Sequence, residues 1–118
     1  MAKQNKLEDF RERRLKGNEK IFAEDFLPYK RYFSLDNKAY EDGAIPVKYK
    51  ELMGLVGSMV LRCNDCITYH IDHSIDAGCT KEELNEAMNI ALVIGGTVVI
   101  PHLRHAMDVI EEKMEEMK

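Results

Sequence analysis

The segment Arg62–His70, RCNDCITYH, contains three side chains whose types and spacing could do chemistry. Cys63 and Cys66 stand three residues apart, and His70 follows four residues after the second cysteine. Two thiols at this spacing can bind a metal ion, cycle between disulfide and dithiol, or pack as small apolar groups. Each interpretation requires a different arrangement of the elements that carry these side chains.

A zinc site is the first interpretation, because His73 would complete a set of four ligands of suitable types. If Cys63 and His73 lie on one helix, they are about 15 Å apart along its axis and cannot share one ion. No second Cys/His pair with finger spacing occurs in the sequence. A covalent haem would need a histidine directly after the second cysteine, where Ile67 stands. The sequence therefore predicts no metal and no bound cofactor.

A redox dithiol is the interpretation that we favour. Thiols near a helix N-terminus meet unpaired N–H groups and the positive end of the helix dipole, and both favour thiolate. A thiolate attacks a peroxide or a disulfide, and the second thiol then closes a disulfide. His70 would lie on the same side of the helix, where an imidazole can relay a proton. Cys79 is predicted to be a buried structural residue.

We expect the first 45 residues to form a helical arm and a loop. Residues 3–22 are highly charged with sparse apolar points, which predicts a surface helix or an arm that lies on a partner subunit. Residues 28–45 contain Pro28 and Asp42-Gly43, so we expect mostly loop there.

Residues 46–118 are expected to form the core helical unit of one compact, all-α, multi-helix domain. Pro46 suits the first residue of a long helix. The apolar stripe predicted for that helix consists of Leu52, Met53, Val56, Met59 and Val60. Asn64 or Asp65 would cap the next helix, which ends at Gly78. Its predicted stripe consists of Ile67, Ile71 and Ile75.

Two further helices complete the prediction. Thr80 and Glu83 form a capping box, and Gly95-Gly96 ends the helix that it opens. The apolar residues of that helix are Leu84, Ala87, Met88, Ala91 and Leu92. A last helix starts near Thr97, with Pro101 in its first turn. A seam spaced like a short coiled coil follows at Leu103, Met107, Ile110, Met114 and Met117.

Composition indicates an ordinary globular chain. Among 118 residues the net charge is −4, which gives no support for nucleic-acid binding. The N-terminus lacks the apolar segment of a signal peptide. The longest apolar run, Ile90–Ile100, is interrupted by glycines and is short for a bilayer span. We therefore expect a cytoplasmic protein that does not insert in a membrane.

The motif and its flanks resemble the alkylhydroperoxidase D-like branch of the carboxymuconolactone decarboxylase family. That branch has a glutamate, eleven residues, the C-x-x-C pair, three residues and a histidine, which here are Glu51, Cys63, Cys66 and His70. The stretches KELMGLVGSMVLRCNDCITYH and EAMNIALVIGGTVVIPHL are also similar to the family, and the resemblance covers about residues 46–110.

The resemblance implies a role for each motif residue. Cys66 would attack the peroxide, Cys63 would resolve the product as a disulfide, and Glu51 and His70 would relay protons. The best-known members carry a further histidine between the cysteines, where this chain has Asp65, an acid that would raise the pKa of nearby thiols.

Only the resemblance assigns Glu51 to the site. From its spacing alone Glu51 would be read as a solvated residue, because a glutamate on a helix is usually exposed. It precedes Cys63 by about 18 Å of straight helix, so the chain must turn back near Arg62 for the two to meet. The remaining histidines, His73, His102 and His105, are predicted to lie on the surface or at an interface.

The favoured function is a thiol-dependent peroxidase or disulfide oxidoreductase, with electrons from an external dithiol such as a lipoyl or thioredoxin-like protein. A decarboxylase acting on a carboxylated lactone is the first alternative, although that chemistry needs no thiol pair. A non-catalytic, oligomeric redox sensor is the second. The resemblance implies a homo-oligomer, a trimer or hexamer, with residues 3–22 and the seam Leu103–Met117 as candidate contacts.

Overall fold

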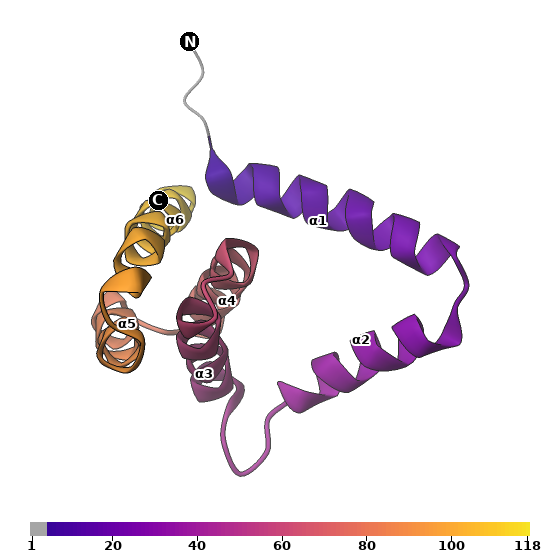
Figure 1. Cartoon of the computed structure of the whole chain (residues 1–118), viewed down its shortest axis with the longest axis horizontal. Helices are drawn as coiled ribbons and strands as arrows, with labels where there is room; N and C mark the ends of the chain where they lie inside the picture. The colour runs from indigo at the N-terminus through magenta and orange to yellow at the C-terminus, as the bar shows by residue number, and fades with distance from the viewer. Residues whose placement is uncertain (1–4) are drawn as a thin grey trace.

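The protein, described here over residues 5–118 by a computed structural model, is built from helices (Figure 1). The elements are α1 (Lys6–Ala23), α2 (Leu27–Ala39), α3 (Val47–Val60), α4 (Asn64–Asp76), α5 (Lys81–Gly95), a 3-10 turn η1 (Gly96–Val99) and α6 (Ile100–Glu116). No strand occurs within residues 5–118, so the predicted all-α class is confirmed.

Helices α3 to α6 enclose the core. Helix α3 packs against α4 and α5, and α4 also packs against α6. The predicted isoleucine stripe of α4 is confirmed, because Ile67 and Ile71 are fully buried and Ile75 is 4% exposed. Burial of each such side chain stabilises the fold by about 1.5–3 kcal/mol.

The predicted apolar stripe of α3 is confirmed except at Met53, because Met59 is buried and Leu52, Val56 and Val60 pack partly buried against the core. Leu55 and Met59 are fully buried, whereas Met53 is 55% exposed. Glu51 precedes Leu55 by four residues and lies on the same inward face, only 4% exposed. The spacing pattern left out Leu55, and it gave no sign that Glu51 is buried, because an acidic residue on a helix usually points to solvent.

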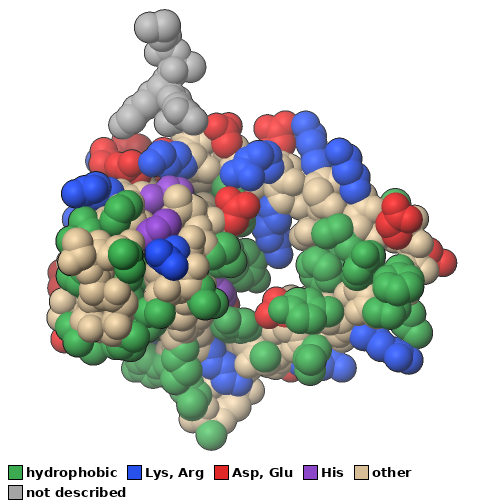
Figure 2. All heavy atoms as spheres, in the orientation of Figure 1, with side chains coloured by type: hydrophobic (Ala, Val, Ile, Leu, Met, Phe, Trp, Pro, Cys, Tyr) green, Lys and Arg blue, Asp and Glu red, His purple; other side chains and the backbone are tan. Residues whose placement is uncertain are grey.

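Helix α2 corrects the prediction that residues 28–45 are mostly loop. Pro28 lies in the first turn of α2, where its missing N–H and fixed φ are tolerated. None of the residues of α2 is buried, and Tyr32 and Leu35 are about two-thirds exposed, at 67% and 69%. The pair α1 and α2 extends away from the other helices (Figure 1). A hollow remains between this pair and the rest of the molecule (Figure 2).

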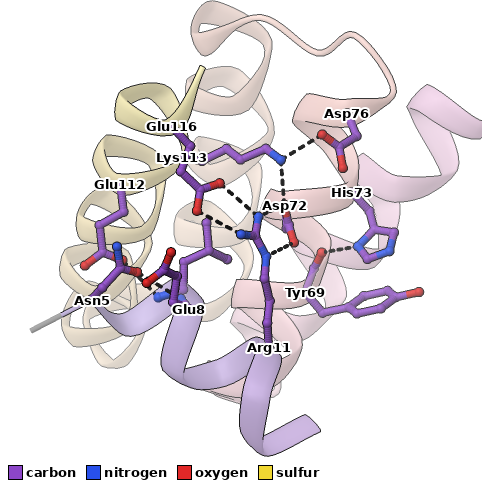
Figure 3. Close-up of polar contacts among 11 residues, drawn as sticks. Asn5, Glu8, Arg11, Tyr69, Asp72, His73, Asp76, Glu112, Lys113 and Glu116 are labelled. Atoms are coloured by element: carbon purple, nitrogen blue, oxygen red, sulfur yellow. Dashed lines mark hydrogen bonds and ion pairs between the residues drawn. The ribbon is translucent and has the colours of Figure 1, made fainter. Parts of the chain in front are cut away.

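Helix α1 is fastened to the core by ion pairs (Figure 3). The guanidinium of Arg11 donates to both carboxylate oxygens of Asp72, at 3.0 and 2.7 Å, and to Glu116 at 2.8 Å. Lys113 donates to Asp72 and to Asp76, both at 2.7 Å. Burial opposes ionisation of Asp72, but the hydrogen bonds from Arg11 and Lys113 outweigh it and lower the pKa of this carboxyl.

The capping box and the end of α5 are as predicted, whereas α6 starts at Ile100, three residues after the predicted Thr97, because the 3-10 turn η1 comes between the two helices. Thr80 Oγ1 accepts from the Glu83 N–H at 3.1 Å, and the Glu83 carboxylate accepts from the Thr80 N–H at 2.9 Å. Helix α5 ends at Gly95, and Gly96 adopts φ +76°, a conformation that glycine tolerates without strain. Pro101 lies in the first turn of α6.

The predicted seam of the last helix lies partly against the core, where Leu103 and Met114 are partly buried, and partly at the surface. Ile110 is buried at 2% exposure within the protomer, whereas Met107 and Met117 are 40% and 61% exposed. The inward positions of α6 are Ala106, Val109, Ile110 and Lys113.

One stretch, Lys81–Glu116, is long and apolar enough to cross a membrane by length and composition. A single such stretch is weak evidence, and it comprises α5, η1 and α6 rather than one helix. Only 17% of its most apolar window is buried inside the protein. Ile90, Val93 and Ile94 of α5 are more than half exposed there.

Candidate functional site

The two motif cysteines lie at the start of α4. The chain reverses direction at Arg62, which has φ +59°, and Cys63 follows as the N-cap of α4. Cys63 and Cys66 are joined by a disulfide, with their Cα atoms 5.3 Å apart. The Cys63 Sγ accepts from the Cys66 N–H at 3.2 Å. The prediction that Asn64 or Asp65 is the cap was therefore wrong by one residue, because a sulfur takes the place of the usual side-chain oxygen.

The turn at Arg62 also brings Glu51 to the motif histidine. Helices α3 and α4 pack side by side after this turn, so Glu51 of α3, twelve residues before Cys63, lies next to His70 of α4. His70 Nδ1 donates to Glu51 Oε2 at 2.8 Å, and both side chains are buried. This hydrogen bond leaves the lone pair of the neutral imidazole on Nε2.

Tyr40 lies at the other nitrogen of the imidazole. Its hydroxyl is 3.5 Å from His70 Nε2, and the two ring centroids are 5.3 Å apart. Partial burial, together with the charge of Glu51, raises the pKa of Tyr40, so the phenol stays a proton donor at neutral pH. The sequence missed this residue, since it follows α2 in a segment that was expected to be loop.

Gly54 makes room for this arrangement. A Cβ atom at this position would lie 2.5 Å from His70 Cε1 and 2.7 Å from the Tyr40 hydroxyl. Real Cβ atoms essentially never approach so closely. The absence of a side chain at Gly54 therefore lets the imidazole lie against α3 and reach Glu51.

A pocket of about 460 Å³ opens beside the disulfide. Cys66 and His70 of α4 both line it, and Tyr69 lies between them in the chain. Helix α1 supplies Phe10, Arg13, Arg14, Gly17, Asn18 and Ile21, while α2 supplies Tyr32 and Asp36. The pocket lies in the hollow that separates α1 and α2 from the core (Figure 2). Cys66 is exposed, and Cys63 is only partly exposed.

The acid between the cysteines has a basic partner. A carboxylate oxygen of Asp65 lies 3.5 Å from a guanidinium nitrogen of Arg13, and both side chains are exposed. This ion pair offsets the negative charge that Asp65 would otherwise place beside the thiols. No sequence pattern connects residues 13 and 65, because only the packing of α1 against α4 brings them together.

The remaining histidines do not line the disulfide pocket. His102 Nδ1 donates to the Asn64 side chain at 2.7 Å, and His105 Nε2 donates to Thr68 Oγ1 at 2.8 Å. His73 is exposed. Burial, and the charge of Lys6, lower the pKa of His105.

Cys79 is buried at 5% exposure and takes no part in the disulfide. Its thiol donates to the Lys48 carbonyl at 3.6 Å, and burial raises its pKa. Over residues 5–118, no group of three or more His, Cys, Asp or Glu side chains is placed to hold a metal ion.

The fold and the site together define a helical protein with a C-x-x-C pair at a helix N-terminus beside a buried Glu–His pair. Residues 28–112 match the model of the carboxymuconolactone decarboxylase family, and the chain belongs to that family. The match begins before residue 46, where the resemblance of the sequence was expected to start.

Solved structures support the same assignment. The chain is similar to TM1620 of Thermotoga maritima, with 49% identity, a TM-score of 0.88, and coverage of 93% of this chain and 98% of that one. A second structure of that protein, at 50% identity, 91% coverage of each chain and a TM-score of 0.87, describes a family member with a suggested part in the antioxidative response. The apo form of lpg0406 of Legionella pneumophila, also of this family, is 27% identical, with a TM-score of 0.82 over 98% of this chain and all of the other.

Curated relatives match over shorter stretches. An uncharacterised protein of Cupriavidus necator is 31% identical over 58 residues, which are 49% of this chain and 51% of the relative. Protein 4 of the cox locus of Paracoccus denitrificans is 26% identical over 81 residues, which are 69% of this chain and 73% of the relative. The chain thus spans about half the length of the first of these relatives.

Proposed function

We propose that the protein is a thiol-dependent peroxidase, with Cys66 as the attacking thiol and Cys63 as the resolving thiol. The observation that carries the proposal is that Cys66 and His70 line one pocket, while Glu51 accepts a hydrogen bond from His70 Nδ1. Cys66 is the cysteine that lines the pocket, which supports its assignment as the thiol that meets the substrate first.

In the reduced protein His70 Nε2 accepts the proton of the Cys66 thiol, and the Glu51 carboxylate stabilises the resulting imidazolium. The thiolate attacks one oxygen of the hydroperoxide, the O–O bond breaks, and the leaving alkoxide takes the proton from the imidazolium and departs as an alcohol. Cys66 is then a sulfenic acid.

The sulfenic acid is resolved within the protein. The Cys63 thiolate attacks the sulfur of Cys66, hydroxide leaves and is protonated to water, and the disulfide forms. An external dithiol, for example on a lipoyl or thioredoxin-like protein, then returns two electrons by exchange and leaves as its own disulfide. No bound cofactor is needed for these steps.

The decisive test compares peroxide consumption by the wild type and Cys66→Ser, with dihydrolipoamide as the reductant. We expect Cys66→Ser to be inactive and Cys79→Ser to retain activity, because Cys79 is buried away from the pocket. Glu51→Gln and His70→Ala should slow thiol oxidation by about 10²–10⁴-fold, the usual contribution of general acid–base catalysis.

Cys63→Ser separates the roles of the two thiols. It should leave a sulfenic acid on Cys66, which dimedone labelling and mass spectrometry would detect. A sulfenic acid found on Cys63 in the Cys66→Ser variant would reverse the assignment.

A redox sensor is the second candidate, favoured by the exposed pair α1 and α2, which could carry a signal to a partner. Rapid oxidation by peroxide without turnover in the presence of dithiols would favour it. The lactone decarboxylase alternative has no comparable support, because that chemistry leaves the thiol pair unused.

We also propose that the protein works as a cytoplasmic homo-oligomer, a trimer or hexamer. An isolated helix of 13 residues is marginal in water, yet α2 has no buried residue in the single chain. A second copy that covers α2 and the exposed apolar side chains of α5 would supply the missing burial. These surfaces join residues 3–22 and the exposed seam residues Met107 and Met117 as candidate contacts.

A further inference from the structure

Three arginines follow one another closely on α1, and two of them have acidic partners. Arg11 is paired with Asp72 and Glu116, and Arg13 is paired with Asp65. Arg14 forms no ion pair with any carboxylate of residues 5–118.

The guanidinium of Arg14 is directed to the disulfide pocket. Its central carbon lies 4.7 Å from the centroid of the Tyr69 ring, and both residues line the pocket with Cys66. The ion pairs of Arg11, one helical turn earlier, fix α1 against α4 and α6 (Figure 3). Arg14 is therefore an exposed positive charge at the edge of the pocket, in contact with the Tyr69 ring and without an ion-pair partner within residues 5–118.

The other walls of the pocket combine apolar or aromatic side chains with polar ones, and among the latter Arg13 and Asp65 are paired with each other. Phe10 and Ile21 come from α1, and Tyr32 comes from α2. A volume of about 460 Å³ is in the range of pockets for small molecules. A planar guanidinium is a specific partner for a carboxylate, which it can bind through two parallel hydrogen bonds.

We propose that this pocket binds a small apolar molecule through its carboxylate, which pairs with Arg14 while the apolar body covers the aromatic wall. The proposal rests on the proposed peroxidase function and adds the chemical class of the reactant. Two reactants of the cycle could carry the carboxylate: the hydroperoxide that oxidises Cys66, or the dithiol that reduces the disulfide.

Asp36 sets the orientation of the bound acid. This residue of α2 also lines the pocket, and it forms no ion pair within residues 5–118. Its charge repels a carboxylate, so the carboxylate lies toward Arg14. Removing the charge of Arg14 should therefore lower the affinity for the carboxylate, and removing the charge of Asp36 should raise it.

Binding is tested first, with no need for turnover. Calorimetry would compare octanoate with neutral octanamide on the oxidised wild-type protein, on Arg14→Gln and on Asp36→Asn. Arg31→Gln removes one positive charge outside the pocket and is the matched control. We expect octanoate affinity to fall about three- to tenfold in Arg14→Gln, to rise in Asp36→Asn and to stay unchanged in Arg31→Gln. Octanamide binding should respond to none of the three.

Two pairs of reactants then identify the source of the carboxylate. The reduced protein is mixed with linoleic acid hydroperoxide or its methyl ester, and the oxidised protein with dihydrolipoate or dihydrolipoamide. In one of the two pairs, Arg14→Gln should lower the rate constant for the acid but not for its neutral ester or amide. Hydrogen peroxide should react equally fast with the wild type and the variant.

The outcomes separate the two proposals. Equal octanoate affinity in the wild type, Arg14→Gln and Asp36→Asn would overturn the carboxylate site, whatever the activity. Normal octanoate binding with no reaction toward any peroxide or dithiol would overturn the peroxidase proposal and leave the binding site standing.

Discussion

Gly54→Ala is the sharpest test of the contact between α3 and the imidazole. Alanine in place of a helical glycine favours the helix by about 0.8–1.0 kcal/mol. At Gly54 the new methyl group would lie 2.5 Å from His70 Cε1, so the ring or the helix must move. Overpacking of this kind costs about 1–3 kcal/mol. The net effect should be a loss of about 0–2 kcal/mol, the difference of these two terms.

Gly57 of the same helix is the matched control. A Cβ atom there has no neighbour within 4 Å, so Gly57→Ala should show the gain in helix propensity alone, about 0.8–1.0 kcal/mol. The two variants should therefore differ in the free energy of unfolding by about 1–3 kcal/mol. Chemical denaturation followed by circular dichroism measures both values under the same conditions.

The displaced ring should also slow the oxidation of the thiols. If His70 leaves Glu51, the 2.8 Å hydrogen bond between them is lost, and stopped-flow oxidation of Gly54→Ala should approach the rate of His70→Ala. In a His70→Ala background the clash with the ring is absent and only that with the Tyr40 hydroxyl remains, so Gly54→Ala should cost less stability there than in the wild type. If Gly54→Ala proves as stable as Gly57→Ala and is oxidised at the wild-type rate, the imidazole does not lie against α3 in solution.

Three further predictions concern the ion pairs, the thiols and the assembly. Folding lowers the pKa of Asp72, so the ionised Asp72 carboxylate stabilises the folded state fully above about pH 4, its pKa in the unfolded chain. This stabilisation is lost as the pH falls through the pKa of the folded state. Asp72→Asn should therefore flatten the pH dependence of the free energy of unfolding in that range. Mass spectrometry of the oxidised protein should find the Cys63–Cys66 bond, and a dominant bond to Cys79 would contradict the structure. Val93→Asp should lower the mass measured by light scattering, because Val93 is 74% exposed; an unchanged mass would exclude this part of α5 from the contacts.

The helices near the motif could be predicted because their boundaries depend on local chemistry. The capping box at Thr80 and the glycine pair at the end of α5 act through neighbouring backbone groups, and they start or end a helix in any tertiary setting. The isoleucine stripe of α4 repeats on one face and was found inside the core.

The features that the sequence did not reveal depend on distant partners. Glu51 is buried only because His70 returns to it from the next helix, and a spacing pattern within α3 cannot show that. Tyr40 joins the site through a loop that places its ring beside the imidazole. Helix α2 carries few inward-facing apolar residues in the single chain, so its periodicity resembles that of an exposed segment.

The N-cap at Cys63 couples the redox state of the protein to the stability of a helix. A thiolate at this position would accept the Cys66 N–H and face the positive end of the α4 dipole, whereas a disulfide sulfur is neutral and a weaker acceptor. Each 1 kcal/mol by which the thiolate cap exceeds the disulfide cap corresponds to roughly 20 mV for a two-electron couple. The reduced form gains this energy, so the cap raises the reduction potential of the disulfide and makes it a better oxidant of an incoming dithiol.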